Sequence, residues 1–376
     1  MPLKLCSKWR RILFTKCCKR NCPVIISGII CVLIVFHIFL RTRLEDFLHP
    51  RSARWEHQCG QQQKRINSPE DLLCQERKKF LPNFKNPCWY DFTGNNSSNR
   101  LRCLPYFHII GVCKSGTTDL FYRLVQHPQI VKNRGLMSKE TWFWSWHRYG
   151  TELWRKGHAD PMDFWDHTLW WLIPQNNGNA SEPVFTTPHL IHHVQPNIKL
   201  ILLLREPAER LYSHYYHLGY GSSPEDFKVD VSASIRYLDR CRAKSSLRSC
   251  LYNRTLFKEM PTPLFASFYD VHMANWLEVF PRNQIFIMRT EDFDKSKKKY
   301  LLQLFKFLNV GDVEERVLDR MSNLAHKYKS VRKDKAGPML NHTRQTLRDY
   351  LREPMKRLAS LLHDEKYTWD DIYIGN

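Results

Sequence analysis

Three short apolar runs, each followed by a helix-like pattern, predict the core of the fold. Each run is almost continuously apolar rather than alternating, which is typical of strands buried on both faces. The runs are residues 106–111 (YFHIIG), 199–204 (KLILLL) and 284–288 (QIFIM), and the helix-like segments are 117–126, 207–218 and 296–308. Strands that alternate with helices in this way indicate an α/β fold, a P-loop-like parallel sheet flanked by helices.

A longer apolar segment near the start of the chain predicts a membrane anchor. Residues 23–40 (PVIISGIICVLIVFHIFL) follow seven Lys or Arg residues and no acid within residues 1–20. Eighteen helical residues span roughly 27 Å, enough for a thin bilayer. A cleaved signal peptide would have a shorter apolar region, and a buried core helix would not follow seven cations. The positive-inside rule places residues 1–22 in the cytosol and the chain after residue 40 in the lumen.

The rest of the chain divides into a stem and one larger domain. Residues 41–100 are polar and broken, which is typical of a lumenal stem, and residues 101–376 form the predicted globular domain. The short span suits the thin membranes of the early secretory pathway, so we expect a single-pass type II protein of the Golgi. The Asn-X-Ser/Thr sequons, at Asn95, Asn96, Asn179, Asn253 and Asn341, agree with this location.

The cysteines also fit an oxidising compartment. Seven of the twelve cysteines follow the predicted anchor, and we expect some of them to pair. Cys241 and Cys250 are close together in a polar stretch and are the favoured pair. Because seven is an odd number, we expect at least one of these cysteines to keep a free thiol.

Charge narrows the choice of partner. The 376 residues contain 58 Lys and Arg against 37 Asp and Glu, a net charge of +21. Such a surplus favours a polyanion: nucleic acid, an anionic membrane or an acidic polysaccharide. A lumenal domain does not meet nucleic acid, so sulfated or carboxylated glycans are the expected partners. The hydrophobic content of 43% excludes a largely disordered chain.

The first strand leads into a candidate phosphate loop. The sequence Gly111-Val-Cys-Lys-Ser-Gly-Thr-Thr118 lies between that strand and the next predicted helix. A glycine turn at a helix start exposes backbone N–H groups, and Lys114 adds a cation. A nucleoside triphosphatase loop has its lysine after the last glycine, which is not the case here. An ordinary tight turn is the alternative.

A second motif follows the second strand. In Leu204-Arg-Glu-Pro-Ala-Glu-Arg-Leu-Tyr-Ser213, Arg205 leaves the strand and Ser213 lies in the following helix. Open α/β sheets bind ligands at the ends of their strands. Taken separately, Arg205 could form an ordinary ion pair and Ser213 could be a surface serine. Taken together, the two motifs suggest a nucleotide with two phosphate groups.

These two motifs resemble those of the Golgi carbohydrate sulfotransferases. The wider sequence, CLPYFHIIGVCKSGTTDLFYRL and LLLREPAERLYSHY, looks like the enzymes that add 6-O-sulfate to N-acetylgalactosamine 4-sulfate. The resemblance implies 3′-phosphoadenosine 5′-phosphosulfate (PAPS) as the donor. It implies that Arg205 and Ser213 bind the 3′-phosphate and that the 5′-phosphosulfate is bound by Lys114, Ser115, Gly116, Thr117 and Thr118.

The resemblance also implies the catalytic groups. Sulfuryl transfer needs a base for the acceptor hydroxyl and a cation at the leaving phosphate. Lys139-Glu140, followed by Trp142 and further aromatics, is similar to the family's Lys-Glu segment. Glu140 is therefore the expected base and Lys114 the expected cation, with Lys139 and Trp142 on the acceptor side.

A basic run near the carboxyl end is a further candidate for the site. Residues 326–335 (HKYKSVRKDK) contain five Lys or Arg residues, including Arg332 and Lys333. Charge runs are usually solvated loops, but the resembling enzymes close a basic loop over the donor and the glycan. We expect no metal, because the histidines at 189, 192, 193, 214 and 217 have no Cys or acidic partner at ligand spacing.

One departure from the family pattern bears on activity. Residues 150–183 are short, and the family's additional core strand before residue 199 is not evident there. The expected function is transfer of sulfate to a glycosaminoglycan, at O-6 of N-acetylgalactosamine 4-sulfate in chondroitin or dermatan sulfate. A catalytically impaired glycan-binding membrane protein of the same fold is the alternative. A lumenal kinase is disfavoured by the position of the lysine.

Overall fold

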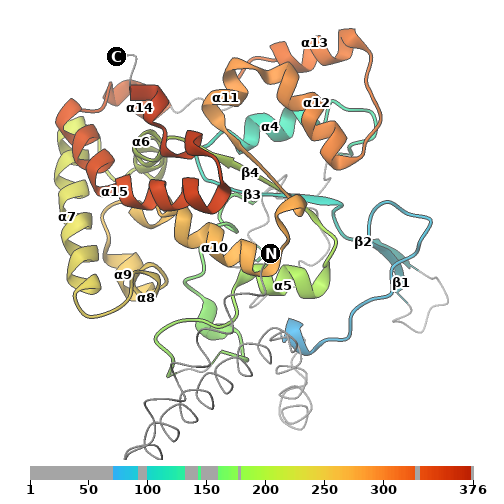
Figure 1. Cartoon of the computed structure of the whole chain (residues 1–376), viewed down its shortest axis with the longest axis horizontal. Coiled ribbons are helices and arrows are strands. Elements are labelled where there is room, and N and C mark those ends of the chain that lie inside the picture. Colours follow the sequence, from blue (N-terminus) through green and yellow to red (C-terminus); the bar gives the residue numbers. More distant parts are fainter. Residues whose placement is uncertain are drawn as a thin grey trace, which may run out of the picture. The chain divides into compact units, whose positions relative to one another are not determined.

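A three-stranded parallel sheet forms the centre of the domain. The computed structural model describes residues 71–91, 100–131, 143–144, 160–176, 179–326 and 331–373. The strands β3 (Phe107–Gly111), β4 (Lys199–Leu204) and β5 (Ile285–Arg289) are adjacent in that order (Figure 1). Ile201 of the central strand is in register with Ile109 and Phe286. The three predicted strands and the parallel sheet are thus confirmed.

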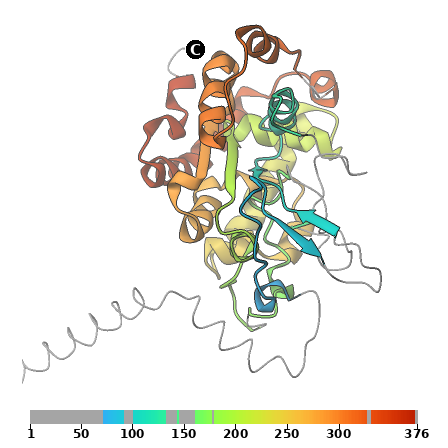
Figure 2. The ribbon, with the colours of Figure 1, turned by 90° about the vertical axis from the view of Figure 1, so that its right-hand side faces the viewer.

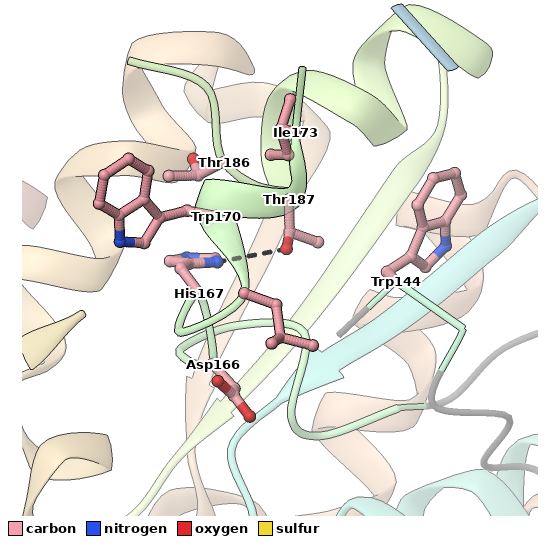
Figure 3. A pocket seen from close by; sticks show the side chains of 8 residues that line it. Trp144, Asp166, His167, Trp170, Ile173, Thr186 and Thr187 are labelled. Atoms are coloured by element: carbon pink, nitrogen blue, oxygen red, sulfur yellow. Dashed lines mark hydrogen bonds between the residues drawn. The ribbon is translucent and has the colours of Figure 1, made fainter. Parts of the chain in front are cut away.

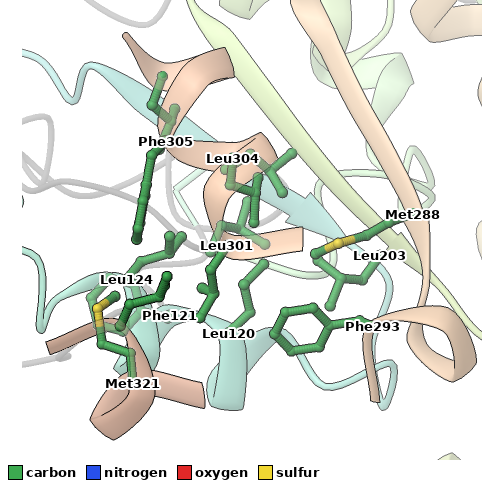
Figure 4. Packing of buried hydrophobic residues seen from close by; sticks show 14 residues of the cluster. Leu120, Phe121, Leu124, Leu203, Met288, Phe293, Leu301, Leu304, Phe305 and Met321 are labelled. Carbon is green, nitrogen blue, oxygen red and sulfur yellow. The ribbon is translucent and has the colours of Figure 1, made fainter. Parts of the chain in front are cut away.

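Three helices, two of which match the predicted segments 117–126 and 296–308, cover one face of this sheet. The helix α4 (Thr117–Leu124) follows β3, and α12 (Lys297–Leu308) and α13 (Glu315–Asn323) follow β5. Their apolar side chains pack on Ile201 and Leu203 in one buried cluster (Figure 4). Because strand side chains alternate between faces, Leu200 and Leu202 point to the opposite side. The continuous apolar run 199–204 therefore supplies two cores.

The opposite face is covered by four other helices that pack on one another (Figures 1 and 2). These are α5 (Thr187–Val194), α6 (Pro207–Leu218), α10 (Tyr269–Val279) and α15 (Asn341–Leu362). The predicted helix 207–218 has the bounds of α6. The remaining elements are η1 (Leu72–Cys74), β1 (Cys88–Asp91), β2 (Arg100–Cys103), η3 (Trp170–Leu172), α7 (Pro224–Arg242), α8 (Leu247–Leu251), α9 (Arg254–Glu259), η4 (Leu264–Ser267), η5 (Arg282–Gln284), α11 (Thr290–Lys295), α14 (Val331–Ala336), η6 (Glu365–Thr368) and α16 (Asp370–Tyr373).

Between cysteines that both lie in the described residues, two disulfides hold local elements together. Cys241 and Cys250 are bonded, which confirms the predicted pair and joins the end of α7 to α8. Cys88 and Cys103 link β1 and β2, which form an antiparallel hairpin (blue and cyan in Figure 1). Cys113 keeps its thiol and is buried beside the carbonyl oxygen of Pro161.

The segment before β1 is folded with the domain. Leu72 and Leu73 are buried, and the side chain of Gln175 donates to the Asp71 carboxylate at 2.6 Å. In addition, His193 Nε2 lies 2.9 Å from the Gln75 carbonyl oxygen. Residues 71–75 are thus bound to the helical face of the domain.

An irregular segment, residues 160–167, lies beside β3 where the sequence lacks the family's additional strand. The Phe164 amide donates to the Ile110 carbonyl at 2.9 Å, and the Phe164 carbonyl accepts from Trp276 Nε1 at 3.0 Å. The apolar residues 170–172 that follow this segment form the 3₁₀ turn η3. Within the described residues, no strand lies between α4 and β4. The hydrogen bond from Phe164 nevertheless covers the edge of β3 at Ile110.

In the part of the chain that the structure describes, no helix combines the length and the apolarity needed to cross a bilayer. The predicted anchor at residues 23–40 lies outside the described residues, as do the sequons at Asn95 and Asn96. Asn179, Asn253 and Asn341 are exposed at the surface. The anchor and the glycosylation of these sites stay predictions.

Gly111→Ala tests the close packing of residues 160–167 against β3. A Cβ atom at Gly111 would lie 2.6 Å from the Phe164 Cβ, and neither atom is the end of a flexible side chain. We expect the free energy of unfolding to fall by about 1–3 kcal/mol, the usual cost of overpacking. Gly311→Ala is the control, because its Cβ would meet only the movable end of Gln129. Equal urea midpoints for the two variants would contradict this packing.

Candidate functional site

The loop after β3 has the backbone conformation of an anion site. Lys114 and Gly116 both have left-handed φ angles, 69° and 83°. Glycine adopts this conformation without strain, whereas lysine rarely does, and such residues cluster at functional sites. Gly116 is the N-cap of α4, so the first amides of the helix, at Thr117 and Thr118, have no intrahelical acceptor. These amides and the helix dipole favour an anion.

The carbonyl groups of the same loop are held by the neighbouring strands. The Thr290 hydroxyl, directly after β5, lies 2.8 Å from the Ser115 carbonyl oxygen and 3.0 Å from that of Leu204. Arg205 Nη1 donates to the Lys114 carbonyl at 3.2 Å. With its carbonyls bound on this side, the loop is fixed by residues from the ends of β4 and β5.

The side chains of the loop fit a phosphate or sulfate group. Ser115 is fully buried, and among the described residues its Oγ has no hydrogen-bond partner. An unsatisfied buried hydroxyl is costly, and an anion oxygen would satisfy it. Lys114 is partly exposed. The pKa of His214 is lowered by its burial first, then by Arg210 and His217, and Lys114 is close enough to contribute as well. Lys114 therefore adds a positive charge to the loop.

The second motif begins at the same edge of the sheet. Pro207 starts α6, and the Glu206 carboxylate caps this helix by accepting from the amides of Ala208 and Glu209 at 3.0 and 2.7 Å. This local structure places Arg205 against the phosphate loop and leaves Ser213 buried on α6, with 4% of its surface exposed. The structure thus joins Arg205 directly to the Lys114 loop.

The basic run is attached to both parts of the site. At its start, His326 Nδ1 lies 3.3 Å from Asp119 Oδ1 on α4. Further on, α14 carries Lys333, whose Nζ lies 2.8 Å from Glu209 Oε2 on α6. Arg332 also lies against the end of α6, because its guanidinium would be 2.5 Å from a Cβ at Gly219. Both predicted cations of this run are therefore near the second motif.

Glu209 is the common partner of three cations. It pairs with Lys333, with Arg344 of α15 (Nη1–Oε1 2.7 Å) and, more weakly, with Arg205 (Nη2–Oε2 3.4 Å). Burial acts to raise the pKa of this carboxyl, but Lys333 and Arg344 outweigh it and lower the pKa to about 2. Glu209 is consequently ionised at any physiological pH.

A small cavity is lined by residues that do not belong to the phosphate loop. Its lining includes Trp144, Asp166, His167 and Thr187 (Figure 3), and His167 Nδ1 lies 3.2 Å from Thr187 Oγ1. Its free space is about that of one water molecule, too little for a sugar or a nucleotide. We assign it no ligand.

Lys139, Glu140 and Trp142 lie outside the described residues, so their roles stay predictions. The structure adds three residues that sequence reasoning missed: Thr290, Glu209 and Arg344. Thr290 directly follows the third strand, and its place at the carboxyl edge of the sheet was a usable signal. Glu209 and Arg344 are ordinary charged helix residues in the sequence.

Thr290→Val tests the clamp on the loop. Valine keeps the shape of threonine but lacks the hydroxyl that lies within hydrogen-bond distance of the Ser115 and Leu204 carbonyl oxygens. Losing one buried hydrogen bond costs about 1–3 kcal/mol, so we expect binding of adenosine 3′,5′-bisphosphate to weaken about tenfold. Isothermal titration calorimetry measures this, with Thr290→Ser as the control that keeps the hydroxyl. Unchanged affinity in Thr290→Val would show that the clamp does not shape the loop.

The Glu209 ion pairs predict a defined pH dependence. Because the folded-state pKa is depressed, the stabilisation is complete above the ordinary value of 4.5 and is lost as the pH falls towards 2. Wild type should therefore be more stable than Glu209→Gln at pH 6, and the difference should disappear near pH 2. Urea unfolding at several pH values measures the difference, and a gap that stays constant with pH would contradict these pairings.

Comparison with known proteins identifies the family of this chain. The sulfotransferase domain model matches residues 105–357, which include the phosphate loop and the second motif with its Glu209. Human carbohydrate sulfotransferase 15 is 32% identical over 388 residues, covering 80% of this chain and 69% of that protein. The Rattus norvegicus protein of the same name is 32% identical and covers 77% and 66%. This chain thus spans about two thirds of the length of these relatives.

Two more distant proteins are also similar to this chain. The membrane-associated sulfotransferase kil1 of Dictyostelium discoideum is 24% identical, covering 72% of this chain and 68% of that protein. A sulfotransferase structure from Alicyclobacillus acidocaldarius aligns at 20% identity with a TM-score of 0.43, covering 69% of this chain and 96% of that one. The resemblance seen in the sequence motifs is confirmed by the domain match, and the chain belongs to the sulfotransferase domain family.

Proposed function

We propose that this chain transfers sulfate from PAPS to a hydroxyl group of a glycosaminoglycan, at O-6 of N-acetylgalactosamine 4-sulfate in chondroitin or dermatan sulfate. The observation that carries the proposal is the contact of Arg205 with the Lys114 loop, because it unites two anion-binding elements in one site. A donor with phosphates at both ends of its ribose matches two such elements. The net charge of +21 and the similarity to carbohydrate sulfotransferase 15 support an acidic glycan as acceptor.

In this proposal the residues of the loop stabilise the leaving group. Lys114 and the amides of Thr117 and Thr118 neutralise the charge that develops on the 5′-phosphate as its bond to sulfur breaks. Arg205 and Ser213 hold the 3′-phosphate and thereby fix the donor in line with the acceptor. Arg332 and Lys333 add positive charge on the same side.

Glu140 is the proposed base. It accepts the proton of the acceptor hydroxyl while that oxygen forms the new bond to sulfur, and the products are the sulfated glycan and adenosine 3′,5′-bisphosphate. Lys139 and Trp142 would lie on the acceptor side. These three assignments rest on the Lys-Glu segment of the sequence alone.

The proposed setting is the Golgi lumen. Residues 23–40 would anchor the chain as a single-pass type II protein, with residues 41–100 as the stem. The cation-rich segment before the apolar run supports this orientation, and the Cys88–Cys103 and Cys241–Cys250 disulfides fit an oxidising compartment.

The covered edge of β3 bears on the alternative of a catalytically impaired glycan binder. That alternative rests on residues 150–183, where the family's additional core strand is not evident in the sequence. Phe164 bonds to Ile110 at the position beside β3, and the loop that follows β3 is held by Thr290 and Arg205. This packing supports an active enzyme despite the short segment.

Sulfate transfer from labelled PAPS to chondroitin, dermatan and heparan chains tests the proposal. We expect label in 4-sulfated chondroitin. Lys114→Ala should lower kcat about 100- to 1000-fold through loss of leaving-group stabilisation. Glu140→Gln should lower kcat about 100- to 10,000-fold through loss of the base.

Lys335→Ala, a cation of the basic run to which we assign no role, is the matched control and should retain activity. A wild-type chain that binds adenosine 3′,5′-bisphosphate but labels no glycan would favour the impaired binder.

A further inference from the structure

The cations around Glu209 carry more charge than that residue neutralises. Arg205, Lys333 and Arg344 each lie within 4 Å of one of its two carboxylate oxygens. Three cations against one carboxylate leave two positive charges in excess. A group of like charges this close repels itself unless further anions are bound. The cluster is therefore suited to a dianion such as a phosphate monoester.

The cluster is accessible to such a ligand. The side chains of Arg205, Lys333 and Arg344 are 26%, 22% and 30% exposed, so each has one side in solvent and the other against Glu209. The three come from different parts of the chain: the end of β4, α14 and α15. Glu209, in the first turn of α6, is the group that these segments share.

Arg205 connects the cluster to the phosphate loop. Its Nη1 donates to the Lys114 carbonyl, while its Nη2 faces Glu209. A ligand that contacts this guanidinium beside Glu209 is thus one side chain away from the loop. Arg344 binds Oε1 of Glu209 whereas Lys333 and Arg205 approach Oε2, so the carboxylate sets the spacing between the cations.

We propose that Arg344 binds the 3′-phosphate of the donor together with Arg205, and that Glu209 is a positioning residue that holds Arg205, Lys333 and Arg344 in one group. This inference rests on the proposed function. Glu209 itself does not touch the ligand. A guanidinium held by a carboxylate on one side has fewer rotamers to lose when a phosphate binds on the other.

Two nucleotides that differ only in the 3′-phosphate test the role of Arg344. Calorimetry on the purified full chain compares adenosine 3′,5′-bisphosphate with 5′-AMP. Arg344→Met should weaken binding of the bisphosphate about tenfold or more, the usual effect of losing a charged hydrogen bond, and should change 5′-AMP binding less than twofold. Arg344→Lys keeps a cation and should give a smaller loss.

Arg352→Met is the matched control, because Arg352 lies on the same helix, is exposed and pairs with Asp349. It should leave both affinities unchanged. If Arg344→Met weakens both nucleotides by the same factor, or neither, Arg344 does not bind the 3′-phosphate. A wild-type chain that binds neither nucleotide would refute the proposed donor as well.

Glu209→Gln distinguishes positioning from competition. A carboxylate that merely competed with the phosphate for its cations would, on removal, strengthen binding of the bisphosphate. A positioning residue would, on removal, weaken it, and we expect at least a fivefold loss for the bisphosphate and a smaller one for 5′-AMP. Tighter binding of the bisphosphate by Glu209→Gln would overturn the positioning role.

Discussion

The site depends on the parallel arrangement of three strands, which brings their carboxyl ends to one edge of the sheet. Thr290, after β5, reaches the carbonyl of Leu204 in β4 and the carbonyl of Ser115 in the loop after β3. One hydroxyl thereby connects all three strand ends. Because the loop carbonyls are bound inside the protein, the amides at the start of α4 are left for a ligand. The left-handed residues Lys114 and Gly116 make this turn possible.

Positive charge is arranged around these strand ends in two groups. Lys114 and the amides of α4 form the first group, and the three cations paired with Glu209 form the second. The Glu209 carboxylate weakens the attraction of the second group for an anion, but it keeps cations from three separate segments together. Arg205 contacts both Glu209 and the Lys114 loop, and it therefore joins the two groups. A donor charged at both ends matches this arrangement better than a single phosphate does.

The sequence predicted the elements whose signals are local. Continuous apolar runs identified the three strands, and the nine-residue separation of Cys241 and Cys250 identified a disulfide. The Lys114 loop and Arg205 were found because each follows a strand. The contacts of Glu209 with Arg344, and of Phe164 with Ile110, join residues far apart in the chain and leave no local pattern. The roles of Glu140 and its neighbours still rest on the sequence.

A crystal structure of the chain with adenosine 3′,5′-bisphosphate is the most direct test of the central claim, that two motifs form one donor site. We expect the 5′-phosphate at the amides of residues 116–118 and Lys114, and the 3′-phosphate within hydrogen-bond distance of Arg205 and Ser213. A nucleotide bound elsewhere, or one with its 3′-phosphate in solvent away from Arg205, would show that the two motifs do not form one donor site.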